Sequence, residues 1–463
     1  MSLSNVPGSF RDPSGFLYYR DNQLYRQINH AYSRQYEHLI QSGLYDELCD
    51  NGMIVPHHEV NLDLAYDDQA YKIIQPQKLP TISYPYEWAF SQLKDAALLT
   101  LSIQQAALKK DIVLKDASAY NVQFHHGRPV FIDTLSFDFY EEGRPWAAYR
   151  QFCQHFLAPL ALMCRTDIRL NQLLRVYIDG IPMDLASALL PTTSKLNFSL
   201  GMHIHLHART QKKFAAQTHS SEKVKGSLSK KSFLALLDNL TSCIQKLVWK
   251  PGGTEWYDYY ESNNNYGEEG LKEKEVLLEK ILRRIAPKTV WDLGSNTGYF
   301  SRIAVKAGAE NVVSWDIDPG CVESNYRMMV RQKETCLLPL LLDLTNPSPG
   351  IGWDNDERLP MQMRAPADAV LALGLIHHLA ISNNVPLSRI ADFFCKLAPW
   401  LILEFVPKED SQVQKLLATR DDIFTTYNQD CFEEQFKELY TIEESVKVQK
   451  TKRTLYCLKR RKK

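Results

Sequence analysis

The second half of the chain alternates short apolar runs with stretches whose apolar residues recur at helical spacing. Alternation of this kind predicts an α/β fold, with a doubly wound parallel sheet and helices on both faces. Residues 445–450 and 454–458 lie close enough in sequence to form an antiparallel hairpin that ends the sheet. The predicted strands are 289–293, 311–315, 337–342, 369–376 and 400–405, and the predicted helices are 299–307, 319–331 and 386–397.

The first half has a different pattern, which predicts an α+β domain. Polar, basic and small residues at 209–231 interrupt the apolar periodicity and predict an exposed basic loop. An amphipathic helix over 232–248 follows, and Pro251-Gly-Gly ends it, so we place a boundary near Gly253 between domains 1–252 and 253–463. Earlier elements are a hairpin over 16–28 turning at Asp21-Asn22, a helix over 31–48, strands near Met53 and Tyr71, and strands 121–124 and 129–132.

Composition and charge narrow the class of protein. With 463 residues, the chain has room for two or three domains of roughly 100–200 residues each. The 54 basic and 54 acidic side chains balance, which argues against nucleic acid as a partner, and the basic residues 459–463 are expected to form a solvated tail. The start lacks a secretory signal, and the most apolar tract, 156–164, is too short to span a bilayer. We therefore expect a cytoplasmic protein without a membrane span.

A glycine-containing loop follows the first predicted strand of the second half. The segment reads Asp292-Leu-Gly294-Ser-Asn296-Thr-Gly298, and glycines at a strand end let the backbone approach a ligand closely. A dinucleotide fingerprint would require Gly-x-Gly-x-x-Gly, but Asn296 and Tyr299 occupy the second and third glycine positions. The sequence therefore argues against NAD.

This segment resembles the first motif of class I S-adenosylmethionine-dependent methyltransferases, in which an acid precedes a glycine-rich loop. The resemblance runs from about Trp256 to the C-terminus and implies S-adenosylmethionine as the cofactor. It implies that Asp292 helps to hold the methionine amino group and that Gly294 and Gly298 give the loop room. Asn296 replaces the usual middle glycine, and Asn is one of the few residues that tolerate a left-handed backbone.

Further acids follow the next two predicted strands. Asp316 ends the second strand, where a carboxylate can accept both hydroxyls of a ribose, and Asp318 is the alternative for this role. The resemblance implies that Asp343, after the third strand, lies near the adenine amino group. Because a lone Asp after a strand is commonly a turn or helix-capping residue, Asp343 is equally well explained as a structural residue.

Three candidates for acceptor chemistry lie near the later strands. Methyl transfer needs a base only if the acceptor atom carries a proton that must leave. His377 and His378 follow the fourth strand, and Glu404 lies at the end of the fifth, where side chains of this family face the acceptor. A structural role is the alternative for each of them. Tyr266, in an aromatic stretch just before the first strand, is a candidate cofactor contact, with core packing as its alternative.

Asp116, Asn121 and Asp133 in the first half carry a second resemblance. Their spacing resembles the catalytic loop and the metal-binding Asp of kinase-like phosphotransferases, notably the aminoglycoside-kinase type. It implies that Asp116 is the loop acid and that Asn121 and Asp133 hold magnesium with ATP. The chain lacks a glycine-rich loop, and Arg26, which we expect to face Glu37, stands where a phosphate-pairing Lys would be. A domain with no activity is therefore a second interpretation.

The motifs together predict a two-domain methyltransferase in which the kinase-like first domain assists acceptor binding. Small molecule, glycan and protein acceptors all stay open. A further resemblance, to methyltransferases of bacterial cell-surface or nodulation-factor pathways, favours sugars. Two other classes of function remain: a bifunctional kinase and methyltransferase, and a regulatory protein that binds S-adenosylmethionine without turnover.

Overall fold

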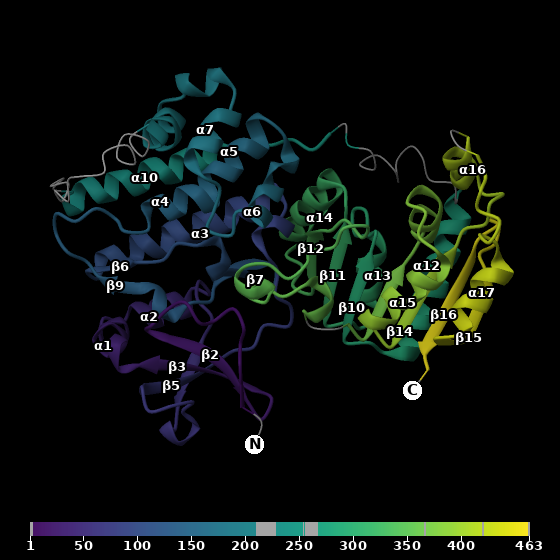
Figure 1. Cartoon of the computed structure of the whole chain (residues 1–463), viewed down its shortest axis with the longest axis horizontal. Helices are drawn as coiled ribbons and strands as arrows, with labels where there is room; N and C mark the ends of the chain where they lie inside the picture. The colour runs from purple at the N-terminus through teal and green to yellow at the C-terminus, as the bar shows by residue number, and fades with distance from the viewer. Residues whose placement is uncertain are drawn as a thin grey trace. The chain divides into compact units, whose positions relative to one another are not determined.

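The computed structural model describes residues 3–209, 228–252, 254, 267–364, 367–418 and 421–461. The chain divides into two compact units (Figure 1). Unit 1 comprises Met1–Lys250 and Pro349–Leu359, and unit 2 comprises Pro251–Ser348 and Pro360–Lys463. The sequence pattern did not predict that the short stretch 349–359, which lies between two strands of unit 2, groups with unit 1. Within the described ranges, no helix has both the length and the apolar character needed to cross a bilayer.

Unit 2 contains a seven-stranded sheet in the order β12-β11-β10-β13-β14-β16-β15 (Figure 1). Strands β10 to β14 pair in parallel, whereas β16 pairs antiparallel with both β14 and β15. The strands are β10 (Thr289–Leu293), β11 (Asn311–Asp316), β12 (Leu337–Leu341), β13 (Ala369–Ala372), β14 (Trp400–Phe405), β15 (Tyr440–Lys447) and β16 (Thr454–Arg460). The helices are α12 (Gly267–Ile285), α13 (Tyr299–Lys306), α14 (Pro319–Gln332), α15 (Leu387–Leu397), α16 (Ser411–Leu417) and α17 (Gln429–Lys437).

This sheet confirms the prediction that its strands are parallel and that it ends in an antiparallel hairpin. The hairpin begins earlier than predicted, at Tyr440, and β13 ends at Ala372 rather than at 376. Lys459 and Arg460 are exposed, as expected of solvated residues, but they belong to the end of β16 rather than to a tail. The chain builds β11 and β12 on one side of β10 and then returns to build β13 on the other. Such a reversal leaves a crevice at the carboxyl ends of the central strands, where doubly wound sheets bind ligands.

The core of unit 2 explains why its strands could be recognised. Strands buried on both faces form nearly continuous apolar runs, and every residue from Val290 to Leu293 is buried, of which only Asp292 is charged. Trp291 and Trp315 contact each other from neighbouring strands, with ring centroids 5.8 Å apart in an edge-on arrangement. Large side chains inside the sheet therefore fix the register of β10 against β11 and the position of the loops that follow them.

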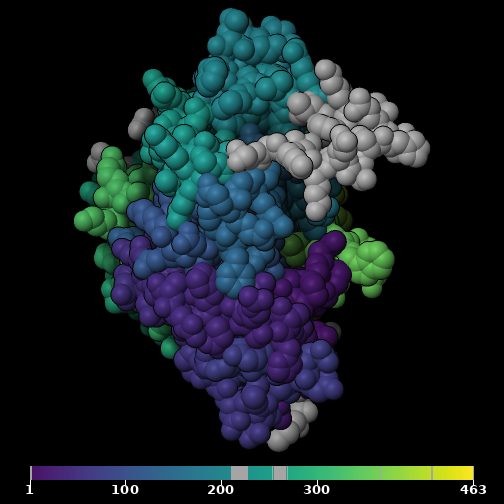
Figure 2. Space-filling model, turned by 90° about the vertical axis from the view of Figure 1, so that its left-hand side faces the viewer, coloured from purple at the N-terminus to yellow at the C-terminus, as the bar shows by residue number. Residues whose placement is uncertain are grey.

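Unit 1 contains a five-stranded antiparallel sheet in the order β1-β2-β3-β5-β4, followed by a helical region. On the face shown in Figure 2, the sheet residues (purple) and the helical residues (blue to teal) form one continuous surface. Unit 1 also contains two short strand pairs, β6 with β9 and β7 with β8. The strands are β1 (Leu3–Asn5), β2 (Gly15–Arg20), β3 (Gln23–Asn29), β4 (His57–Val60), β5 (Ala70–Pro76), β6 (Ile112–Leu114), β7 (Val122–His125), β8 (Arg128–Phe131) and β9 (Phe137–Phe139). The helices are α1 (Ser33–Gln41), α2 (Leu44–Asp50), α3 (Phe90–Lys109), α4 (Tyr149–Phe152), α5 (Ala158–Arg165), α6 (Leu173–Val176), α7 (Met183–Leu189), α8 (Phe198–Leu200) and α10 (Lys230–Lys246).

Both predicted hairpins of unit 1 are confirmed. Asp21 and Asn22 have φ of 50° and 64° in the first turn, and His126 and Gly127 have φ of 48° and 73° in the second. The prediction of one helix over 31–48 is wrong, because Gly43 adopts a left-handed conformation and separates α1 from α2. The predicted basic loop lies outside the described residues between 210 and 227.

Candidate functional site

The loop between β10 and α13 is built from three left-handed residues. Gly294, Asn296 and Gly298 have φ of 76°, 52° and 77°. Asn296 thus adopts the backbone conformation that its place in the motif predicts. Gly298 caps the N-terminus of α13, and the backbone N–H of Gly294 donates to the carbonyl of Trp315 on β11. The loop therefore lies where β10 and β11 end, at the ligand-binding edge of the sheet.

Gly298→Ala is expected to destabilise unit 2 by about 2–4 kcal/mol, because alanine is strained in the left-handed conformation of this residue and its Cβ would clash with a neighbouring side chain. An ideal Cβ at Gly298 would lie 2.4 Å from Nδ2 of Asn325. Gly43→Ala is the matched control, since Gly43 has a similar φ of 70° and open space around it. Denaturant unfolding of both variants measures the difference. Equal losses would show that the contact with Asn325 contributes nothing.

Asp292 lies at the carboxyl end of β10 with only 2% of its surface exposed. Its Oδ2 accepts a hydrogen bond of 2.6 Å from the hydroxyl of Ser301, which in turn accepts one from Ser314. Burial raises the pKa of Asp292 to about 7, against the opposing effects of Ser301 and of the Lys274 charge. Among the described residues, no cation lies within ion-pair distance of this carboxylate, so its negative charge is poorly compensated.

Asp316, at the end of β11, holds the glycine-containing loop. Its Oδ2 accepts from the backbone N–H of Asn296 at 2.6 Å, and its Oδ1 accepts from that of Asp318 at 2.9 Å. Burial raises the pKa of Asp316 to about 6, although these two hydrogen bonds oppose the shift. The structure therefore brings Asp316 next to the loop that begins at Asp292, as the sequence predicted.

The other two predicted acids have structural partners. Asp318 is the N-cap of α14, and its Oδ1 accepts from the backbone N–H of Gly320 at 2.7 Å. Asp343, after β12, accepts from both the backbone N–H and the hydroxyl of Thr345, at 2.8 and 2.6 Å. These are the capping and turn arrangements that the sequence left as alternatives. The cofactor roles of Asp318 and Asp343 stay predictions.

His377 and His378 follow β13 on the other side of β10. His377 is buried, and its Nδ1 has no hydrogen-bond partner among the described residues. Burial lowers the pKa of His377 well below its usual value and that of His378 to about 4, with the charge of Arg453 contributing to both shifts. Both imidazoles are therefore neutral at pH 7, the state in which a histidine accepts a proton. Their catalytic role stays a prediction.

Glu404 belongs to a buried cluster of four charged side chains, which also contains Lys274, Arg453 and Asp410. Its Oε2 accepts from Nζ of Lys274 at 2.9 Å and lies 3.7 Å from Nη1 of Arg453. Arg453 donates to Asp410 from Nε at 2.8 Å and from Nη2 at 3.2 Å. The sequence analysis missed Lys274, Arg453 and Asp410. A carboxylate already bonded to cations is better suited to hold them than to remove a proton, and the catalytic role of Glu404 stays a prediction.

The acidic residues of the first half lie together in unit 1. Asp116 accepts from the backbone N–H of Ser118 at 2.8 Å, and burial raises its pKa. Nδ2 of Asn121 donates to the hydroxyl of Ser136 at 3.2 Å, and that hydroxyl donates to Oδ2 of Asp133. Oδ1 of Asp133 pairs with Arg26. Arg26 therefore does not face Glu37, which instead accepts from Tyr71, and that expectation is wrong.

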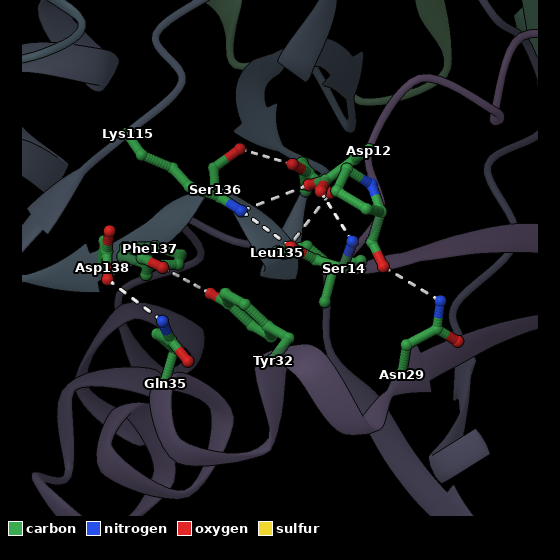
Figure 3. Close-up of polar contacts among 12 residues, drawn as sticks. Asp12, Ser14, Asn29, Tyr32, Gln35, Lys115, Leu135, Ser136, Phe137 and Asp138 are labelled. Carbon is green, nitrogen blue, oxygen red and sulfur yellow. Dashed lines mark hydrogen bonds and ion pairs between the residues drawn. The ribbon is translucent and has the colours of Figure 1, made fainter. Parts of the chain in front are cut away.

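The side chains around this acidic cluster form hydrogen bonds and ion pairs with other residues of unit 1 (Figure 3). Nζ of Lys115 donates to the hydroxyl of Ser14 at 2.9 Å and lies 3.3 Å from Oδ2 of Asp12. The hydroxyl of Tyr32 donates to the carbonyl of Phe137 at 2.6 Å. Within the described ranges, no three His, Cys, Asp or Glu residues form a group that could hold a metal ion. Both oxygens of Asp133 have protein partners, so these residues fit a magnesium ion poorly.

Tyr266 and the aromatic stretch around it lie outside the described residues. The predicted cofactor contact of Tyr266 therefore stays a prediction. The described part of the site comprises the loop after β10, the acids that end β10 and β11, and the histidines after β13.

Together these features define a doubly wound α/β protein with buried carboxylates at the ligand-binding edge of its sheet. No protein-family model matches the chain. The chain is 36% identical over 459 residues to nodulation protein NoeA of Rhizobium meliloti (strain 1021). The aligned region covers 98% of this chain and 96% of that protein. The chain therefore belongs to the family of nodulation protein NoeA.

The chain also resembles parts of solved structures of other proteins. PH0226 protein from Pyrococcus horikoshii OT3 is 16% identical and covers 45% of this chain and 100% of its own, with a TM-score of 0.32. N-methyltransferase NodS from Bradyrhizobium japonicum WM9, in complex with S-adenosyl-L-homocysteine, is 11% identical and covers 44% and 92%, also with a TM-score of 0.32. The 16S rRNA methylase RmtB is 14% identical and covers 66% and 97%, with a TM-score of 0.31.

Proposed function

We propose that this chain is an S-adenosylmethionine-dependent methyltransferase whose cofactor site lies at the carboxyl ends of β10 and β11. The observation that carries the proposal is the pair of buried carboxylates, Asp292 and Asp316, beside a loop of three left-handed residues. Neither carboxylate forms an ion pair with a described residue, and burial raises the pKa of both. A site with uncompensated negative charge is suited to a ligand that carries positive charge, as S-adenosylmethionine does on its sulfonium and ammonium groups.

Each residue of this site has a role in the proposal. Asp292 binds the ligand ammonium group. Asp316 accepts the ribose hydroxyls with the second lone pair of each oxygen, while the first accepts from the backbone N–H of Asn296 or Asp318. Gly294 and Gly298 supply the left-handed backbone that turns the loop around the ligand. When bound, S-adenosylmethionine supplies an electrophilic methyl group. The remaining task of the chain is to place an acceptor in line with that methyl group.

A neutral imidazole after β13 completes the proposed mechanism. His378 or His377, which are both neutral at pH 7, receives the proton of a hydroxyl or amine acceptor, although their lowered pKa makes both weak bases. The acceptor is a small molecule, a glycan or a protein, and unit 1 assists its binding. We do not extend the proposal to a magnesium nucleotide in unit 1, because Arg26 and Ser136 already bond both oxygens of Asp133.

Calorimetry of the full chain with S-adenosylmethionine tests the cofactor assignment. We expect micromolar binding by the wild type and a loss of about 10- to 100-fold in Asp316→Ala, because two charge-assisted hydrogen bonds to the ribose disappear. Asp392→Ala is the control, since Asp392 is an exposed acid on α15 of the same unit. Unchanged affinity in Asp316→Ala would refute the ribose assignment. A cell-extract screen with labelled cofactor, comparing the wild type with Asp292→Ala, then identifies the acceptor.

A further inference from the structure

The buried charged cluster of unit 2 lies next to the proposed cofactor site. Glu404 is near the end of β14, Lys274 lies in α12, and Arg453 immediately precedes β16. The side chains of Lys274 and Arg453 are each 2% exposed, and that of Glu404 is fully buried. Among the described residues, the cluster contains two cations and two anions, Asp410 included. Desolvation of four charges costs so much that such a cluster needs a reason beyond stability.

Lys274 connects this cluster with the helix that contacts Asp292. Its Nζ lies 4.4 Å from the centre of the Phe300 ring, in the first turn of α13. The next residue of α13, Ser301, donates the hydrogen bond of 2.6 Å to Asp292. The ammonium group of Lys274 therefore contacts the turn of α13 from which Ser301 bonds the Asp292 carboxylate.

The groups that face Asp292 come from three elements. Ser301 of α13 donates to it, and Ser314 of β11 supports that hydroxyl. Lys274 of α12 stabilises its charged form, whereas Asp316 of β11 destabilises it. Lys274 is the cation of this set, and Glu404 is the anion that holds it at 2.9 Å.

We propose that Lys274 is a positioning residue of the cofactor site, which stabilises the Asp292 carboxylate so that it can bind the ammonium group of the ligand. Glu404 then acts as the partner that fixes Lys274 and keeps it protonated, rather than as a base. The inference rests on the proposed function for the identity of the ligand. Its electrostatic part, the dependence of the Asp292 charge on Lys274, stands without any ligand.

Titration of Asp292 in the ligand-free full chain tests this dependence. The infrared band of the buried protonated carboxyl, assigned by its loss in Asp292→Asn, reports the midpoint, which we expect at about pH 7 in the wild type. Lys274→Met should raise this midpoint by about one pH unit, because the stabilising cation is lost. Lys306→Met is the control, since Lys306 is an exposed lysine of α13 that pairs with Glu279, and its midpoint should equal that of the wild type.

Glu404→Gln tests the same dependence from the other side of the ion pair, because Glu404 keeps the buried Lys274 protonated while burial lowers the pKa of this lysine. Without the anion Lys274 loses its proton more readily, so the midpoint of Asp292 should rise toward that of Lys274→Met. If Lys274→Met does not fold, Lys274→Met/Glu404→Gln removes both members of the ion pair and should raise the midpoint above that of the wild type. Equal midpoints in all these variants would overturn the inference. Because the titration needs no ligand, a wild type that binds no S-adenosylmethionine would refute only the proposed function.

Discussion

Arg453→Met is expected to lower the free energy of unfolding of unit 2 by about 3–5 kcal/mol, the usual cost of removing one member of a buried ion pair. The guanidinium bonds Asp410 at 2.8 and 3.2 Å and lies 3.7 Å from Glu404. Without it, Asp410 loses both of these hydrogen bonds, and Glu404 keeps its hydrogen bond from Lys274. Met keeps much of the volume, so the loss measures charge rather than a cavity.

Hydrogen exchange of the β14 and β16 amides provides the local measurement for this variant, because a chain of two units need not unfold in one step. Lys452→Met is the control, since Lys452 is the exposed neighbour of Arg453 and should change exchange little. A double variant, Arg453→Met/Asp410→Leu, should lose less stability than the sum of its single substitutions, because it leaves one fewer unpaired charge. Exchange rates in Arg453→Met equal to those in Lys452→Met would contradict the expected cost.

The parallel sheet could be predicted because its strands are buried on both faces. The predicted limits of 289–293 and 400–405 equal those of β10 and β14. Such strands leave uninterrupted apolar runs, and the turns between them contain glycine and polar residues. The hairpin was predicted too short, because β15 alternates partly buried and exposed residues after Tyr440 and has the charged pair Glu443-Glu444 at its centre.

The candidate site was predictable only where the chemistry follows a strand end. Asp316 is the last residue of β11 and Asp292 the last but one of β10, and turn residues follow both strands, so their location follows from the topology. Lys274 has no such signal, because it lies in the run Lys272-Glu-Lys-Glu275, which is typical of a solvent-exposed helix face. Only the packing of α12 against α13 shows that its ammonium group is buried.

The acidic cluster of unit 1 shows a second limit of prediction from the sequence: spacing along the chain does not identify side-chain partners. Spacing along the chain correctly placed Asn121 and Asp133 on adjacent strand ends, because the hairpin at His126-Gly127 brings them together. It could not identify the partner of Arg26, since that depends on which face of β3 the side chain occupies. Arg26 pairs with Asp133. The spacing of Asn121 and Asp133, which is typical of a metal site, therefore occurs here in a cluster that contains an ion pair.

Asp292→Asn is expected to stabilise ligand-free unit 2 by about 2–4 kcal/mol at pH 8 and to have little effect on stability at pH 3. The pKa of Asp292 is about 7 in the folded chain, against 3.8 for an ordinary Asp. At pH 8 the carboxylate is charged in both states, so the folded state bears the cost of burying it. At pH 3 the group is protonated in both states, and the cost is absent. Between these limits the folded state binds more protons than the unfolded state, so this contribution to stability falls as the pH rises from about 4 to 7.

Denaturant unfolding of the wild type and Asp292→Asn across this pH range gives the difference, and calorimetry on the same samples gives the affinity for S-adenosylmethionine. Asn can still accept the hydrogen bond from Ser301 but carries no charge to bind an ammonium group. The variant should therefore be more stable and bind more weakly, with a loss of about 10- to 100-fold in affinity. Asp392→Asn should change neither quantity. If Asp292→Asn were less stable than the wild type at pH 8, the carboxylate would be structural, and the case for a cationic ligand at this position would fail.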